Sequence, residues 1–162
     1  MRFEKVLPSC FINDSRSNGF EPSADVYAAI KLPERKTAKS CGYDFCTPYK
    51  VVLKPKERRV IPTGIKAVNM PDNTGLFLFI RSSVGIKKGI VFSNNTGVID
   101  SDFAGNVGND GDIHLALWNT SDKTVTFEAG ERIAQGVFMV YLTVENDSAD
   151  GIRKGGIGST NE

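Results

Sequence analysis

Short apolar stretches, rich in β-branched and aromatic residues, recur along the chain and are separated by Gly, Pro, Asn or Asp. In the segment Ile113-His114-Leu115-Ala116-Leu117 the large aliphatic side chains occupy every second position, so they lie on one face of a half-buried strand. Short strands at this spacing indicate an all-β barrel or sandwich. We predict strands at residues 49–53, 60–68, 75–80, 90–92, 113–118, 123–127 and 136–144, with turns at 71–75, 94–97 and 128–130.

Two segments have helical character. Residues 23–31 begin with Ser23 as an N-cap and stop before Pro33. Residues 82–88 form one or two helical turns that end at Gly89. The pattern therefore predicts a β-rich fold with one or two short helices.

The totals are those of one soluble globular domain. The chain has 162 residues, of which 40% are hydrophobic and 24% are charged. Its net charge of +1 gives no overall field that attracts nucleic acid or an anionic membrane, so we expect neither as a partner. The longest apolar run, residues 76–80, is too short to span a bilayer. Residues 1–4 lack the order of a secretory signal, and we expect a cytoplasmic location.

Cys10, Cys41 and Cys46 are the three cysteines, and an odd number in a chain of this size fits a reducing compartment. Cys41 and Cys46 are close enough in sequence to supply two of the four ligands of a zinc site. The chain has no second pair of ligands, however, and His114 is its single histidine. We therefore assign the cysteines as structural or incidental thiols.

Two segments point to phosphate chemistry. Residues 153–160 are basic and glycine-rich, and a loop of this composition brings backbone N–H groups close to a polyphosphate. The same composition also fits simple disorder. Asp100 ends an apolar strand, where a carboxylate is placed to activate water beside that phosphate. The plainer alternative is an aspartate that caps a turn.

Three further clusters suit a nucleotide, and each has an ordinary alternative. A strand is followed by Arg81, Ser82 and Ser83, whose N–H groups, hydroxyls and guanidinium suit an oxyanion. The alternative is a serine that caps a helix beside a surface arginine. Residues 94–97 form a hairpin whose backbone and asparagine amide suit recognition of a nucleobase edge. The alternative is an ordinary hairpin turn, in which Asn and Gly are the expected residues. For Gln135 the candidate roles are to bind phosphate or to orient a metal-bound water, and the alternative is an ordinary surface residue.

Taken in order, five segments resemble the motifs of the trimeric deoxyuridine triphosphatases, or dUTPases. They are residues 41–45, 81–83, 97–105, 130–135 and 155–160. The resemblance implies an all-β, jelly-roll-like β-barrel (β-clip) that forms a homotrimer, with each active site assembled from three subunits. It divides the chain into an N-terminal extension packed on the domain (1–31), a dUTPase-like β-barrel (32–144) and a mobile C-terminal arm with the glycine-rich motif (145–162).

The resemblance also implies a reaction. dUTP would be hydrolysed at the α-phosphorus to dUMP and pyrophosphate, which limits uracil incorporation into DNA and supplies dUMP for dTMP synthesis. Asp100 would be the catalytic base. Mg²⁺ would be the cofactor, held by the triphosphate and reached through water by Asp44 and Gln135. The implied substrate-binding residues are Arg81, Ser82, Ser83, Asn94, Gly97, Val98, Ile99, Phe103, His114, Gln135, Arg153, Gly156, Ile157, Gly158 and Ser159.

Some of these residues receive individual roles from the resemblance. Asn94 and the backbone of residues 97–99 would read uracil, and Phe103 would pack beneath the deoxyribose and exclude a 2′-hydroxyl. The tail from Arg153 would close over the triphosphate. Phe103 stands where the family usually has tyrosine, and Ile157 stands where an aromatic ring usually stacks on the uracil.

Two alternatives to the dUTPase hypothesis stay open. A dCTP deaminase shares this fold and an Arg-Ser-Ser element, but Ala116 occupies the position of its catalytic glutamate. The other alternative is a dUTPase-like protein that acts mainly as a regulatory binding partner. Residues 1–31 and an inserted loop at 107–112, which the resemblance does not explain, motivate it.

Overall fold

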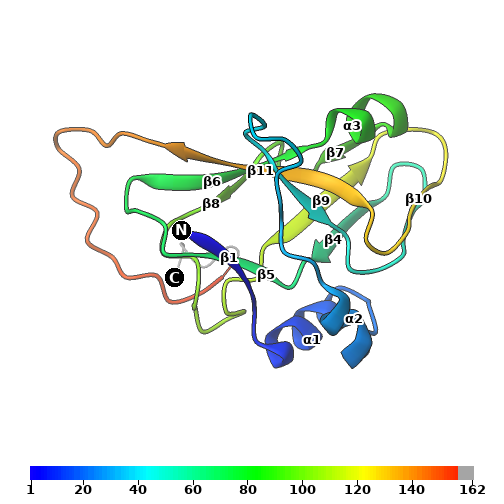
Figure 1. Cartoon of the computed structure of the whole chain (residues 1–162), viewed down its shortest axis with the longest axis horizontal. Helices are drawn as coiled ribbons and strands as arrows, with labels where there is room; N and C mark the ends of the chain where they lie inside the picture. The colour runs from blue at the N-terminus through cyan, green and yellow to red at the C-terminus, as the bar shows by residue number, and fades with distance from the viewer. Residues whose placement is uncertain (157–162) are drawn as a thin grey trace.

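The computed structural model describes residues 1–156, which form eleven strands and three short helices (Figure 1). In chain order the elements are β1 (Arg2–Lys5), α1 (Pro8–Ser17), α2 (Ala24–Ala29), β2 (Tyr43–Cys46), β3 (Val51–Leu53), β4 (Arg58–Pro62), β5 (Ile65–Val68), β6 (Thr74–Ile80), α3 (Ser82–Lys88), β7 (Ile90–Phe92), β8 (Gly97–Ile99), β9 (His114–Asn119), β10 (Val125–Phe127) and β11 (Arg132–Val140). None of the described helices has the length and apolar character needed to cross a membrane.

All strand pairs among the described residues are antiparallel, and they form four sheets. The largest has the order β2-β11-β6-β8, and a three-stranded sheet has the order β4-β9-β7. Two small sheets pair β1 with β5 and β3 with β10. In the largest sheet β11, the last strand of the described residues, lies between β2 and β6, so segments far apart in the sequence become neighbours.

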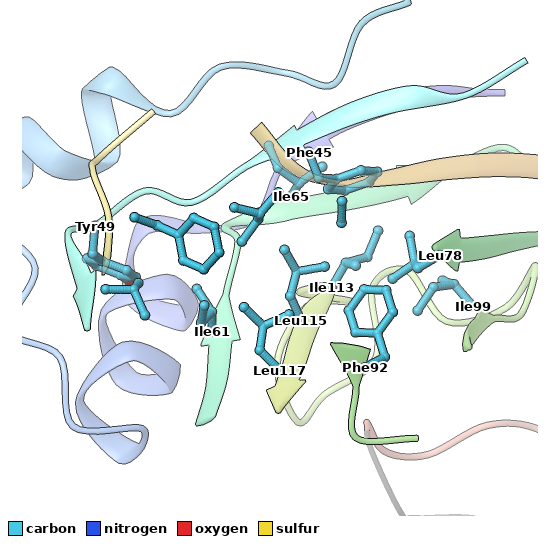
Figure 2. Packing of buried hydrophobic residues seen from close by; sticks show 14 of the residues in the cluster. Phe45, Tyr49, Ile61, Ile65, Leu78, Phe92, Ile99, Ile113, Leu115 and Leu117 are labelled. Carbon is cyan, nitrogen blue, oxygen red and sulfur yellow. The ribbon is translucent and has the colours of Figure 1, made fainter. Parts of the chain in front are cut away.

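The hydrophobic core lies between these sheets. Leu78 and Ile99 of the four-stranded sheet point toward Leu115 and Phe92 of the three-stranded sheet (Figure 2). The alternation predicted before and along β9 is confirmed, because Ile113, Leu115 and Leu117 are all fully buried. Alternate side chains of a strand point to opposite faces, which explains the burial of these aliphatic residues.

The predicted strand at residues 60–68 is divided in two. Thr63 and Gly64 separate β4 from β5, and Gly64 adopts a φ of +70° that few other residues accept. The Asp112 carboxylate accepts hydrogen bonds from the N–H groups of both residues, at 3.2 and 2.8 Å. Asp112 is almost fifty residues away from the interruption between β4 and β5 that it stabilises, so the local sequence pattern did not reveal the interruption.

Residues 1–31 supply two helices and one strand. Helix α2 is the predicted one, and the Ser23 hydroxyl accepts its capping hydrogen bond from the Val26 N–H at 3.3 Å. Helix α1 was not predicted. It buries Phe11 completely, and the ring stacks on Tyr49 with centroids 5.7 Å apart.

After β11 the chain leaves the sheet. The predicted strand at 136–144 ends earlier, at Val140, and residues 141–150 are exposed. Figure 1 shows this segment turning back along the molecule. Arg153 then contacts Asp102, and Gly156 lies beside Asn109.

Candidate active site

The predicted site residues gather in two separate pockets. We call the first the arginine pocket; it is lined by Lys36, Ser40, Gly42, Asp44, Arg81, Ser82, Arg132 and Gln135. We call the second the hairpin pocket; it is lined by Val60, Asn94, Gly97, Val98, Ile99, Asp100, Phe103, His114, Ala116, Arg153 and Gly156. Ser83 is exposed on α3 and does not belong to the lining of either pocket.

In the arginine pocket the strand register places two oxygen donors together. Asp44 on β2 lies directly opposite Gln135 on β11, so both side chains emerge on the same face. Gly42 makes room for them, since a Cβ at this position would lie only 2.5 Å from Gln135 Oε1. A side chain at position 42 would therefore displace the Gln135 amide from its present position.

In this pocket the Asp44 carboxylate forms ion pairs with two guanidinium groups. Arg81 Nε lies 3.0 Å from Asp44 Oδ1, and Arg132 Nη1 lies 2.9 Å from Asp44 Oδ2. A bulge between Arg132 and Ala134 shifts the register of β11 against β2. Two arginines with one aspartate leave a net positive charge, whereas the charge of Lys36 is matched by its ion pair with Glu34. The pocket is therefore suited to bind an anion.

The hairpin pocket is built around the turn that precedes β8. Asn95 adopts a φ of +63°, and β8 then pairs with β6 so that Leu78 faces Gly97. Phe103 is buried at the pocket, whereas the Asp100 side chain is 56% exposed. The pocket thus offers backbone and amide groups, an aromatic ring and an accessible carboxylate.

Arg153 from the C-terminal segment occupies the hairpin pocket of the same chain. Its guanidinium forms an ion pair with Asp100 and donates from Nε to Asp102 at 2.8 Å. The carbon of the guanidinium lies 5.7 Å from the centre of the Phe103 ring. The hydrogen bond to Asp102 is the main cause that raises the pKa of Arg153. Arg153 therefore reaches the proposed base rather than the arginine pocket of its own chain.

His114 lines the hairpin pocket, but one of its nitrogens faces two carboxylates. Nε2 lies 2.9 Å from Asp14 Oδ2 and 3.9 Å from Asp112 Oδ2. Burial raises the pKa of Asp112 to about 7, and the charge of His114 opposes this shift. Sequence reasoning treated His114 as a residue without such partners, because Asp14 is a hundred positions away.

Asp100 and Arg81 lie level with opposite ends of β6. Ile99 pairs with Leu76, so Asp100 comes level with Gly75 near the start of the strand. Arg81 directly follows Ile80 at its other end. Six residues at about 3.3 Å each separate these levels, which amounts to roughly 20 Å. One chain therefore cannot bring its own Asp100 and Arg81 onto the same phosphate.

Several lining residues were not predicted as site residues, namely Lys36, Ser40, Gly42, Val60, Ala116 and Arg132. Arg132 was within the quoted segment 130–135, so its charge was the available signal. The predicted residues Ile157, Gly158 and Ser159 lie outside the described residues.

A positively charged pocket and a hairpin pocket with a carboxylate, carried on antiparallel sheets, are features of nucleotide-binding β proteins as a class. The family model named dUTPase matches residues 28–161. Among curated proteins, the chain is 42% identical over 135 residues to a deoxyuridine 5′-triphosphate nucleotidohydrolase of Lactococcus lactis, covering 82% of this chain and 89% of that protein. It is 38% identical to the protein of the same name from Hydrogenobaculum, covering 80% and 89%. The chain belongs to the dUTPase family.

Solved structures agree in fold. The dUTPase of Streptococcus mutans superposes with a TM-score of 0.71 at 35% identity, covering 90% of this chain and all of that one. The dUTPase of Staphylococcus bacteriophage 80alpha, solved as a mutant with dUpNHpp, gives a TM-score of 0.61 at 26% identity, covering 75% and 83%. The predicted all-β, jelly-roll-like class is confirmed.

Proposed function

We propose that this chain hydrolyses dUTP to dUMP and pyrophosphate, with Asp100 directing water onto the α-phosphorus. The observation that carries the proposal is the content of the two pockets: an exposed carboxylate beside a hairpin in one, and a cluster of arginines in the other. The names of the relatives and the family model support uracil as the base. Such an activity limits uracil in DNA and supplies dUMP for dTMP synthesis.

The active site is proposed to form between subunits of a homotrimer. The separation of roughly 20 Å between the levels of Asp100 and Arg81 along one strand supports this arrangement. One subunit supplies the hairpin pocket and another supplies the arginine pocket. The C-terminal segment, whose Arg153 here contacts Asp100 of its own chain, would leave that position to close a site of another subunit. Closed rings of identical subunits provide such shared sites without further partners.

Each pocket has its own task in this proposal. The hairpin from Asn94 to Ile99 reads the uracil edge, and Phe103 packs against the deoxyribose. Arg81, Arg132 and Ser82 hold the phosphate oxygens and neutralise their charge. Asp100 takes a proton from the attacking water, and fixed positions replace a random encounter between water and phosphorus.

The residues present fit a Mg²⁺ ion that arrives with the triphosphate. Asp44 and Gln135 place hard oxygen donors on one face of the arginine pocket. Because both oxygens of Asp44 already bind arginines, contact through water suits this carboxylate better than direct ligation. When bound, Mg²⁺ supplies charge neutralisation on the phosphates.

We place the protein in the cytoplasm, with no nucleic-acid or membrane partner. Its three cysteines are free thiols, as expected in a reducing compartment. The net charge of +1 provides no general attraction to polyanions.

Neither alternative is favoured. Ala116 lines the hairpin pocket where a deaminase needs a carboxylate, and a methyl group transfers no proton. The segments that motivated a regulatory role contribute to the fold itself: the Leu7 N–H donates to Asp110 at 2.8 Å, and Asp110 pairs with Lys66.

The Asp100→Asn variant tests the proposal. Pyrophosphate release from dUTP with Mg²⁺ should fall by roughly a hundredfold to ten-thousandfold, the usual contribution of a general base. Binding of a non-hydrolysable dUTP analogue should persist, because the amide keeps the shape of the side chain. Asp72→Asn, at an exposed turn, should leave the rate unchanged. An unchanged rate for Asp100→Asn would make the assignment wrong, and ammonia release from dCTP would favour the deaminase.

A further inference from the structure

Three side chains with metal-ligating atoms meet at the seam between α1 and the three-stranded sheet. They are Asp14 from α1, Asp112 from the loop before β9, and His114 at the start of β9. One ligand atom of each lies within 4.8 Å of the others. This cluster is separate from the arginine pocket, where the nucleotide's Mg²⁺ is proposed to bind.

One oxygen in the cluster lacks a partner. Asp112 is fully buried, and its Oδ1 accepts the N–H groups of Thr63 and Gly64. Its Oδ2 faces His114 and has no hydrogen-bond partner among the described residues. A buried carboxylate oxygen without a donor is unfavourable, and buried polar atoms are almost always satisfied. The oxygen is therefore an acceptor that needs either a hydrogen-bond donor or a cation.

A proton on His114 does not satisfy this oxygen. Nε2 already lies 2.9 Å from Asp14, and the 3.9 Å to Asp112 Oδ2 is too long for a hydrogen bond. A divalent cation does satisfy it: the ion would displace the proton from His114 Nε2 and neutralise the two carboxylates.

The spacing of the ligand atoms also suits a cation. With metal–ligand bonds of about 2.1 Å, neighbouring ligand atoms lie about 3.0–3.4 Å apart in octahedral and tetrahedral sites. The two separations from His114 Nε2, 2.9 and 3.9 Å, lie on either side of these values, and the two carboxylate oxygens lie within 4.8 Å of each other. A small rotation of the His114 ring toward Asp112 would shorten the longer of the two separations.

We propose that Asp14, Asp112 and His114 bind one divalent transition-metal ion, for which Zn²⁺ is the best match. A mixed set of imidazole and carboxylate donors suits Zn²⁺, whereas Mg²⁺ prefers oxygen ligands alone. The ion joins α1 of the N-terminal segment to β9, whose His114 also lines the hairpin pocket. It therefore fastens residues 1–31 to the domain.

Metal-stripped full-length protein in a Cys41→Ser background tests the proposal, because the exposed Cys41 thiol is itself a zinc ligand. Calorimetric titration with Zn²⁺ should give one ion per chain. At a hundredfold excess over its dissociation constant, Zn²⁺ should raise the melting temperature by roughly 5–10 °C. Mg²⁺ at the same concentration should raise it much less. No saturable Zn²⁺ binding, or an equal effect of Mg²⁺, overturns the proposal.

Two variants locate the ion. Asp112→Asn keeps the Oδ1 acceptor for Thr63 and Gly64 but removes the charge and one ligand, so it should abolish the Zn²⁺-dependent rise in melting temperature. Asp14→Asn, at the edge of the cluster, should do the same and decides the matter if Asp112→Asn does not fold. Asp25→Asn, exposed on α2, should bind Zn²⁺ as the parent does. Binding that survives in both cluster variants contradicts the assignment; dUTP hydrolysis plays no part in this readout.

Discussion

Gly42 and the Gln135 amide approach each other more closely than any side chain at position 42 allows. Gly42→Ala should push the Gln135 amide away from Asp44, and misplacement of a site group by about 1 Å lowers kcat/KM by up to roughly a hundredfold. Steady-state kinetics with dUTP measures the effect, while the free energy of unfolding should change by less than about 1 kcal/mol.

The matched control is Gly85→Ala on α3, where an added Cβ meets its nearest neighbours at an ordinary contact distance of 3.7 Å. This variant should retain the parent's kcat/KM. If Gly42→Ala behaves in the same way, the position of Gln135 does not matter to the reaction.

For single residues, the sequence indicated many of the side chains that line the pockets but not the residues that each of them contacts. Asp44, Arg81 and Gln135 were all identified before the structure showed them around one pocket. Arg132 was missed, because strict alternation places it on the opposite face from Gln135, and only the bulge in β11 changes that. The pairing of His114 with Asp14 was invisible, since no local pattern joins residues from opposite parts of a chain.

At the scale of elements, helix α1 shows that the N-terminal segment contributes to the core. Phe11 is 0% exposed and stacks on Tyr49 near α2 and β4. Phe11→Ala should lower the free energy of unfolding by about 3–5 kcal/mol, as loss of a buried ring usually does. Denaturant titration measures it, and Leu7→Ala, whose side chain is largely exposed, should have an effect within about 0.5 kcal/mol. An equally small effect of Phe11→Ala would mean that residues 1–31 are a loosely attached appendage.

Alternation predicted the strands because most of them have one buried face, and β9 is the clearest example. Helix α1 was missed because few apolar residues mark it: Phe11 and Ser15 are its only fully buried positions among ten residues. Leu7 at its N-cap also offers no capping side chain. The domain boundaries at 31 and 144 stay predictions; the burial of Val6, Phe11 and Phe20 argues for one continuous core.

For the whole molecule, the distance between the pockets predicts complementation between inactive chains. Asp100→Asn and Arg81→Ala should each be nearly inactive alone, since each lacks one half of every site. Mixed trimers refolded from equal amounts should recover roughly one quarter of the parent's activity, the share of sites that receive both intact halves. Pyrophosphate release before and after co-refolding measures this recovery. Mixing without any recovery would place the complete site within a single chain.

No sequence pattern predicted the distance between Asp100 and Arg81 along β6. The order of motifs along the chain says nothing of which end of β6 each one reaches; only the register of β8 and β11 against β6 does. The sequence thus predicted the components of the site through resemblance, while their division between two pockets required coordinates.

The position of β11 also has a consequence for biosynthesis. A ribosome releases β2 and β6 first, yet in the finished sheet neither touches the other, because β11 lies between them. Until translation reaches residues 132–140, both strands present unpaired edges, which are prone to wrong association. A message truncated before codon 132 would therefore yield a polypeptide with Asp44 and Arg81 but no means of bringing them together.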